Sequence, residues 1–155
     1  MSVTEQKLKE IGITLPEMRP PVANYVPAVR TGNLLFLSGN LPAPRPDGSE
    51  IRGKLGKDVT VDEGYEAARL VGVNLLAVLK NTLGDLDKVK RIVKLLSMVN
   101  VTPDFTEMPA VANGCSDLLV EVFGDRGRHA RSAVGMASLP LNIPVEIEMV
   151  VEVED

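Results

Sequence analysis

The fold class follows from a stretch in the middle of the chain, residues 60–99, TVDEGYEAARLVGVNLLAVLKNTLGDLDKVKRIVKLLSMV. It opens with Thr60 and Glu63, whose spacing is that of a capping box at the start of a helix. Apolar residues then recur at helical spacing and predict a helix over residues 61–82. They are Ala68, Val71, Leu75, Leu76, Leu79 and Leu83. Residues 89–99 are a strand-length run rich in Val, Ile, Leu and Met, which predicts a strand.

A hairpin precedes this stretch. Residues 25–30 and 34–38 read as two strands, joined by a turn at Gly32-Asn33. The turn formers of residues 42–58 predict a long, mobile loop between hairpin and helix. Residues 1–19 are expected to form an N-terminal surface arm with a short helix over residues 4–11.

The arm is expected to continue into an extended lead-in, because Pro16, Pro20 and Pro21 disfavour helix.

A second helix and two more strands follow. Pro109 suits the first turn of a helix and Gly124 suits its end. Residues 132–138 and 145–153 are expected to be strands, and the last alternates apolar residues with glutamates, as a strand with one buried face does. The order ββαβαββ predicts an α+β fold, with two helices on one face of a sheet whose other face meets water or another subunit. The length of 155 residues favours a single domain, residues 1–155.

Composition disfavours several partners. The 17 basic and 21 acidic residues give a net charge of −4, which does not favour binding to phosphate backbones. Aromatic residues make up 3% of the chain, so platforms for stacking RNA bases are scarce. Nucleic acid is therefore a disfavoured partner.

The cysteine and histidine content excludes other classes of site. The single cysteine, Cys115, cannot form an internal disulfide, and with one histidine, His129, it cannot complete a structural zinc site.

No apolar run approaches the roughly 20 residues of a membrane span, and the first residues do not resemble a signal peptide. We expect a cytoplasmic protein with no metal and no membrane attachment.

Three parts of the sequence carry a family resemblance: residues 25–42, Asn113, and residues 130–148 with their Ala-Arg-Ser, Leu-Pro and Glu-Ile-Glu motifs. Together they resemble the YjgF/RidA (Rid) family, also called endoribonuclease L-PSP-like, over about residues 20–153. The resemblance implies a chorismate-mutase-like fold and a homotrimer with small-molecule sites in clefts between subunits. It also implies cofactor-free hydrolysis of 2-imino and enamine acids to 2-oxo acids and ammonia.

The resemblance assigns two principal site residues. Arg131 is expected to anchor a substrate carboxylate, because a guanidinium forms a rigid bidentate fork. Glu146 is expected to orient or deprotonate the attacking water. Tyr25, Ser38 and Asn113 are further candidates for substrate contacts.

Each assignment has a structural alternative. Arg131 could be a solvated residue of a basic turn, and Glu146 could belong to a solvated strand face. Tyr25 could be an edge packing residue, Ser38 the ordinary end of a strand, and Asn113 a helix cap.

The sequence also departs from the family pattern. Many members have a cysteine two residues after the arginine, where this chain has Ala133, and Asn24 stands where Gly-Pro is common. Cys115 is expected to be a buried, inert thiol rather than a substitute. With the long loop of residues 42–58, these differences favour a divergent subgroup.

The sequence is compatible with three functions. The leading one is hydrolysis of imines or enamines. The second is a non-catalytic trimer that binds a small metabolite through the same arginine. The third is an endoribonuclease, which the acidic charge, the scarce aromatics and the lone histidine disfavour.

Overall fold

The order of helices and strands follows the predicted ββαβαββ pattern, preceded by a short helix. The computed structural model describes residues 2–18 and 23–155, so the predicted lead-in at Pro20 and Pro21 lies outside the described residues. The helices and strands are α1 (Val3–Glu10), β1 (Ala28–Thr31), β2 (Leu34–Asn40), α2 (Val61–Leu83), β3 (Val89–Asn100), α3 (Met108–Phe123), β4 (Ala130–Met136) and β5 (Val145–Val153). Short 3-10 turns lie at η1 (Leu86–Lys88), η2 (Gly124–Gly127) and η3 (Pro140–Asn142).

The strands form one mixed sheet in the order β1-β2-β5-β3-β4. The β3–β4 pair is parallel and the other pairs are antiparallel. The central strand, β5, has the predicted alternation: Val145, Ile147, Met149, Val151 and Val153 are buried, and the residues between them are not. One face of the sheet therefore forms the core.

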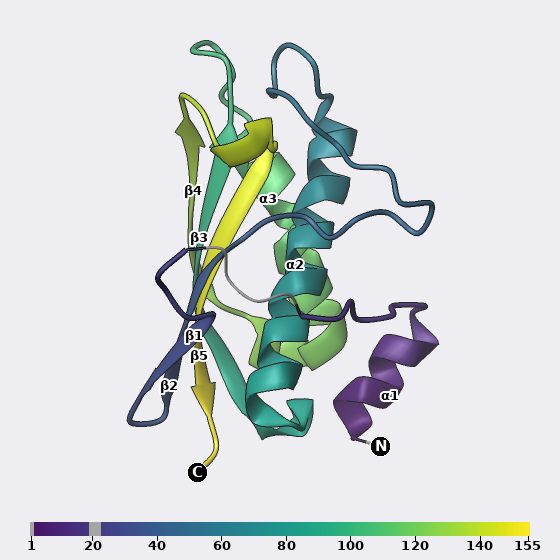
Figure 1. Ribbon diagram of the computed structural model, residues 1–155, viewed down its shortest axis with the longest axis vertical. Coiled ribbons are helices and arrows are strands. Elements are labelled where there is room, and N and C mark those ends of the chain that lie inside the picture. The colour runs from purple at the N-terminus through teal and green to yellow at the C-terminus, as the bar shows by residue number, and fades with distance from the viewer. Residues whose placement is uncertain (1, 19–22) are drawn as a thin grey trace.

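Both long helices, α2 and α3, pack on that buried face (Figure 1), which confirms the predicted α+β arrangement. Helix α2 begins with the predicted capping box, in which Thr60 Oγ1 and the Glu63 carboxylate each accept the other residue's backbone N–H. Gly114 allows the close approach of α3 to α2, because a Cβ there would lie 1.9 Å from the Tyr65 carbonyl oxygen.

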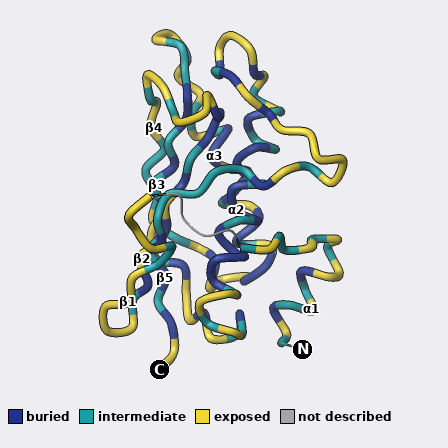
Figure 2. Tube along the Cα trace, viewed as in Figure 1, coloured by how far each residue is buried: buried dark blue, intermediate teal, exposed yellow. Residues whose placement is uncertain are grey.

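The opposite face of the sheet is partly apolar. The strand register places Phe36 opposite Val29 and Val150, and Val134 opposite Met98, all on this face. Val29, Phe36 and Val134 are 52%, 46% and 36% exposed. Figure 2 shows the contrast between buried strand and helix segments and the exposed loops and sheet edge.

Two predicted strands have different bounds. The first begins at Ala28 rather than Tyr25, since Pro27 has no N–H to donate to the sheet. The strand predicted over residues 132–138 runs over residues 130–136, because its pairing with β3 begins at Ala130 opposite Lys94.

The loop of residues 42–58 contains no regular helix or strand, but its second half is anchored rather than free. Leu55 is fully buried and bridges to Val59 and Val101. Its N–H donates to the Asn100 carbonyl, and its own carbonyl accepts from the N–H of Thr102. This half of the loop is fixed against the end of β3.

Helix α1 of the N-terminal arm is also docked onto the domain. Leu8 of α1 is buried, and the Asp87 carboxylate accepts hydrogen bonds from the backbone N–H groups of Val3 and Thr4 and from the Thr4 hydroxyl. Helix α1 is therefore held against η1.

Candidate functional site

Arg131 lies on β4, an outer strand of the sheet, and points toward α3. Its register partner on β3 is the fully buried Leu95, and paired residues point to the same side. The Arg131 Nη1 group donates to Asn113 Oδ1 at 2.9 Å and to Ser116 Oγ at 3.0 Å. The structure thus brings Arg131 and Asn113 together and adds Ser116.

The remaining donors of the Arg131 guanidinium have no protein partner among the described residues. Nη1 has two hydrogens, and the contacts with Asn113 and Ser116 use both. Within residues 2–18 and 23–155, Nε and Nη2 have no hydrogen-bond acceptor, and no carboxylate pairs with Arg131. The Nε–H and one Nη2–H lie side by side, and this edge matches the two oxygens of a carboxylate.

A histidine extends this group. His129 Nε2 lies 2.9 Å from Ser116 Oγ, and His129 Nδ1 lies 2.6 Å from the Gly127 carbonyl oxygen. Burial lowers the pKa of His129, and the positive charge of Arg131 lowers it further, while the Gly127 carbonyl opposes this. The ring is therefore biased toward its neutral form.

Neither Ser116 nor His129 was assigned from the sequence, although spacing could have indicated both. Ser116 follows Asn113 by three residues, which places the two on one face of a helix. His129 precedes Arg131 by two residues, which places the two on one side of an extended chain.

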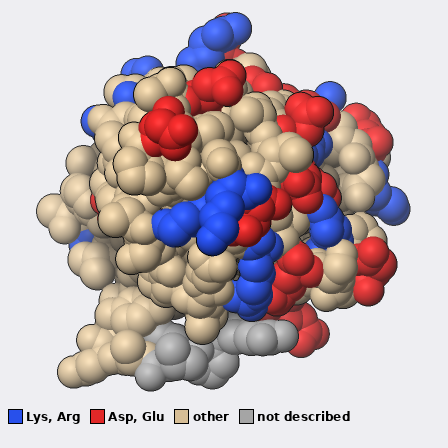
Figure 3. Space-filling model, turned by 90° about the horizontal axis from the view of Figure 1, so that it is seen from above, with Lys and Arg blue, Asp and Glu red and all other residues tan. Residues whose placement is uncertain are grey.

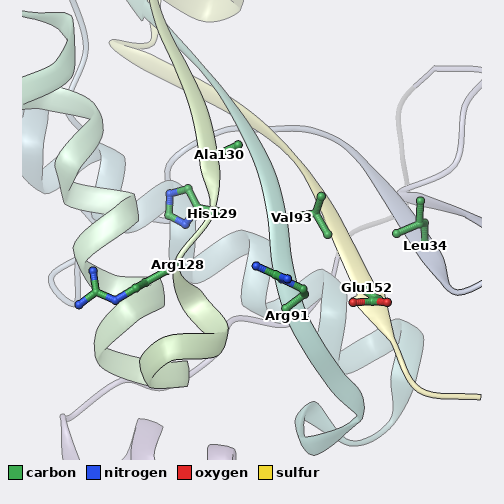
Figure 4. Close-up of a pocket in the computed structure, with 7 residues that line it drawn as sticks. All are labelled: Leu34, Arg91, Val93, Arg128, His129, Ala130 and Glu152. Atoms are coloured by element: carbon green, nitrogen blue, oxygen red, sulfur yellow. The ribbon is translucent and has the colours of Figure 1, made fainter.

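A groove lies beside the start of β4. Its lining residues come from β2, β3, β5, the first residue of β4 and the two residues before it, and its volume is about 540 Å³. Figure 4 shows these residues: Leu34, Arg91, Val93, Arg128, His129, Ala130 and Glu152. Arg131 does not line this groove, but His129 lines it and also contacts Ser116, a partner of Arg131, so the groove lies beside the Arg131 group.

Tyr25 and Ser38 meet near the other edge of the sheet. Ser38 Oγ donates to the Val26 carbonyl oxygen at 2.7 Å, so the serine fastens the segment that carries Tyr25. Tyr25 is 50% exposed. Both residues line a small cavity of about 80 Å³, together with Gly39 and Asn40 of β2.

Glu146 lies next to Gly39. A Cβ built on Gly39 would lie 2.3 Å from Glu146 Oε2, so the carboxylate occupies the space that the missing side chain leaves. Burial raises the pKa of Glu146, and the neighbouring charge of Glu148 adds to this effect. A carboxyl group with a raised pKa can take up and release a proton closer to neutral pH.

Within one chain, Glu146 and Arg131 do not meet. They lie on β5 and β4 with β3 between them, and two strand spacings of about 4.8 Å separate the backbones by about 10 Å. Their partners on β3 are Met98 and Leu95, which lie three residues apart, so the two side chains point to opposite faces. The candidate residues therefore form two groups: Arg131 with Asn113, and Tyr25 and Ser38 near Glu146.

Cys115 is fully buried in α3, as predicted, and burial raises its pKa to about 12. Because the thiolate is the reactive form, this thiol is inert near neutral pH. Ala133 lies two residues beyond Arg131 and opposite the buried Ser97, so no thiol is present at that place.

The charged side chains on the face shown in Figure 3 are of both signs and interspersed. In the part of the chain that the structure describes, there is no cluster of three or more His, Cys, Asp or Glu side chains that could hold a metal ion. No helix in the same part combines the length and apolar character needed to cross a membrane.

Known proteins share the sequence pattern and the fold of this chain. Residues 5–153 match the family described as "YjgF/chorismate_mutase-like, putative endoribonuclease". Protein TCP17 of Trypanosoma cruzi is 46% identical, over 96% of this chain and 92% of its own length. A solved protein of unknown function from Agrobacterium tumefaciens is 47% identical, with a TM-score of 0.89 over 98% of this chain and 93% of its own.

A third relative is named for an enzymatic activity. The 2-iminobutanoate/2-iminopropanoate deaminase of Dermatophagoides farinae is 30% identical, over 92% of this chain and 95% of its own length. The lower identity to this relative agrees with a divergent subgroup. The chain belongs to the YjgF/RidA family, with its chorismate-mutase-like fold.

Proposed function

We propose that this protein hydrolyses reactive 2-imino and enamine acids to 2-oxo acids and ammonia. The observation that carries the proposal is the open Nε–Nη2 edge of Arg131, whose charge has no carboxylate partner among the described residues. Such an edge suits the carboxylate of an amino-acid-derived substrate. The similarity to an imine deaminase supports the same chemistry.

The site is completed, in this proposal, by a second copy of the chain in a homotrimer. Arg131 lies on an outer strand and Glu146 points to the opposite face, so a cleft between neighbouring subunits can bring together what one chain keeps apart. The exposed Val29, Phe36 and Val134 give that face an apolar surface for a neighbour to cover. In a closed cyclic trimer every subunit makes the same two contacts with its neighbours, so the same surfaces are buried on each.

The proposed reaction assigns a proton path to Glu146. Arg131 binds the substrate carboxylate, and a water molecule attacks the carbon of the protonated imine. Glu146 accepts a proton from that water as the carbon–oxygen bond forms, which gives a tetrahedral carbinolamine. The carbinolamine nitrogen takes up that proton from Glu146, and Glu146 then removes the proton of the new hydroxyl group as the carbon–nitrogen bond breaks. The 2-oxo acid and ammonia are released, and the ammonia takes up this proton and leaves as ammonium. The steps use one water and no cofactor.

Tyr25, Ser38 and Asn113 have supporting parts in this scheme. Asn113 Oδ1 accepts a hydrogen bond from Arg131, so the amide NH2 group of Asn113 remains for the ligand. Ser38 holds the Tyr25 segment through Val26, and the half-exposed Tyr25 ring can cover the bound molecule.

A trapping assay tests the function. Imines are generated from a panel of amino acids by an amino-acid oxidase and trapped with semicarbazide. The proposal predicts that the protein diminishes the trapped product and that Arg131→Ala abolishes this effect. A folded parent protein that leaves the trapped product unchanged but binds a 2-oxo acid would instead be a metabolite-binding protein.

A further inference from the structure

We infer that Ser116 and His129 are positioning residues, which hold the Arg131 guanidinium so that its open edge faces the ligand. The role of that edge in binding a ligand rests on the proposed function, but the hydrogen bonds that hold it are present in the protein without a ligand. They join Arg131 to Ser116, Ser116 to His129, and His129 to the Gly127 carbonyl.

The carbonyl of Gly127 sets the direction of this chain. A carbonyl oxygen can only accept, so the His129 Nδ1 at 2.6 Å must carry a hydrogen. In the neutral ring Nε2 is then an acceptor, and it takes the single hydrogen of the Ser116 hydroxyl at 2.9 Å. The Ser116 oxygen keeps its lone pairs for the Arg131 Nη1 group.

The setting of Ser116 explains why the histidine is needed. A serine in the middle of a helix can turn its hydroxyl back to the carbonyl four residues earlier. Ser116 lies in the middle of α3 (Met108–Phe123), yet its hydroxyl points outward to His129. The ring therefore fixes the rotamer that presents the serine oxygen to Arg131.

The result is a guanidinium held on one nitrogen. Asn113 and Ser116 occupy both hydrogens of Nη1, so rotation about the Nε–Cζ bond would break two hydrogen bonds. The Nε–Nη2 edge then points away from α3 before any ligand binds, so ligand binding does not have to order the side chain. In this way Ser116 and His129 act on the ligand only through Arg131.

The test uses the fact that His129 is the single histidine of the chain. Its ring nitrogens can be observed by 15N NMR without ambiguity, and the Arg131 guanidinium signals are those lost in Arg131→Lys. At pH 7.5 we expect the Nδ1–H tautomer of His129 and slow exchange between Nη1 and Nη2 of Arg131. Ser116→Ala and His129→Leu should each accelerate that exchange, and Ser116→Thr, which keeps the hydroxyl, should restore it.

Ser132→Ala is the matched control, because Ser132 adjoins Arg131 on β4 but its partner on β3, Leu96, lies on the opposite face. It should leave the exchange unchanged. With 2-oxobutanoate as the probe, Ser116→Ala should weaken binding about 3- to 10-fold, the effect of one hydrogen bond, and raise KM more than it lowers kcat.

Two results would overturn the inference: a His129 ring in the Nε2–H or charged form, or Arg131 exchange that is the same in the parent, Ser116→Ala and His129→Leu. The exchange measurement needs no ligand. An inactive parent protein with the expected exchange pattern would therefore refute the proposed function and leave the positioning of Arg131 supported.

Discussion

Replacing Arg131 by lysine separates the charge of the side chain from its shape. In the structure, Nη1 of Arg131 binds Asn113 and Ser116, and the Nε–Nη2 edge has no acceptor among the described residues. In the proposed function this edge binds the substrate carboxylate. A lysine ammonium keeps the positive charge but has one nitrogen, so it cannot bind α3 and also form a two-point contact with a ligand.

The expected magnitude follows from the lost contact. A hydrogen bond to a charged group contributes roughly 1.5 to 3 kcal/mol, and 1.4 kcal/mol corresponds to a factor of ten, so kcat/KM should fall by roughly 10- to 150-fold. Arg131→Ala should fall further, because it also removes the charge. The measurement is semicarbazide trapping of imines at several substrate concentrations.

Arg128→Lys is the matched control for this comparison. Arg128 lies three residues before Arg131, is largely exposed, and contacts Asp125 at 3.4 Å. It should keep parental kinetics, since such surface substitutions have small effects. Melting temperature and sedimentation must show that each variant is folded and assembled as the parent is. Parental imine hydrolysis by a folded Arg131→Ala trimer would refute the assignment and most of the functional argument.

Three further variants test the second group of residues and the core. Gly39→Ala places a Cβ 2.3 Å from Glu146 Oε2, so the carboxylate must move and hydrolysis should fall between about 10- and 100-fold with little change in melting temperature. Parental activity would contradict a role for the carboxylate. Glu148→Gln removes one cause of the raised pKa of Glu146, so the acid limb of the kcat/KM profile should move to lower pH, and an unmoved limb would mean another group titrates there. Cys115 should react with thiol reagents only after unfolding, and Cys115→Ser should lower stability by about 1 to 3 kcal/mol but keep activity; a tenfold loss of turnover in folded protein would argue against a packing role.

The long helix and the last strand could be predicted from sequence because local signals there agree with the tertiary structure. The Thr60–Glu63 capping box and the apolar repeat define α2 to within a residue, and the alternation of residues 145–153 defines β5. The start of β4 could not be predicted, since it depends on parallel pairing with β3, and that pairing leaves no mark in the local sequence.

The site was less accessible to sequence reasoning for a related reason. A family motif could single out Arg131, but the partners of its guanidinium come from α3, and only the packed fold shows that Ser116 and His129 lie in contact. The anchoring of Leu55 was hidden in the same way, because residues 42–58 have the composition of a free loop and their contacts lie at the far end of β3.

The separation of Arg131 from Glu146 leads to a test of where the site lies. If each site takes Arg131 from one subunit and Glu146 from its neighbour, two inactive variants should restore activity when their subunits mix. Arg131→Ala supplies an intact Glu146, and Glu146→Gln supplies an intact Arg131.

Consider trimers assembled at random from equal amounts of the two variants. A site is intact only where Arg131 comes from a Glu146→Gln subunit and Glu146 comes from its Arg131→Ala neighbour. That arrangement occupies about a quarter of the interfaces of a cyclic trimer, so about a quarter of the parental activity should return after joint unfolding and refolding. Each variant refolded alone should stay inactive. If both residues served one site within a single chain, mixing would restore nothing, because no chain in the mixture carries both. Activity near zero in the mixed trimers, with mass spectrometry showing that the subunits had exchanged, would therefore reject the inter-subunit site while leaving the role of Arg131 to be judged by its own variants.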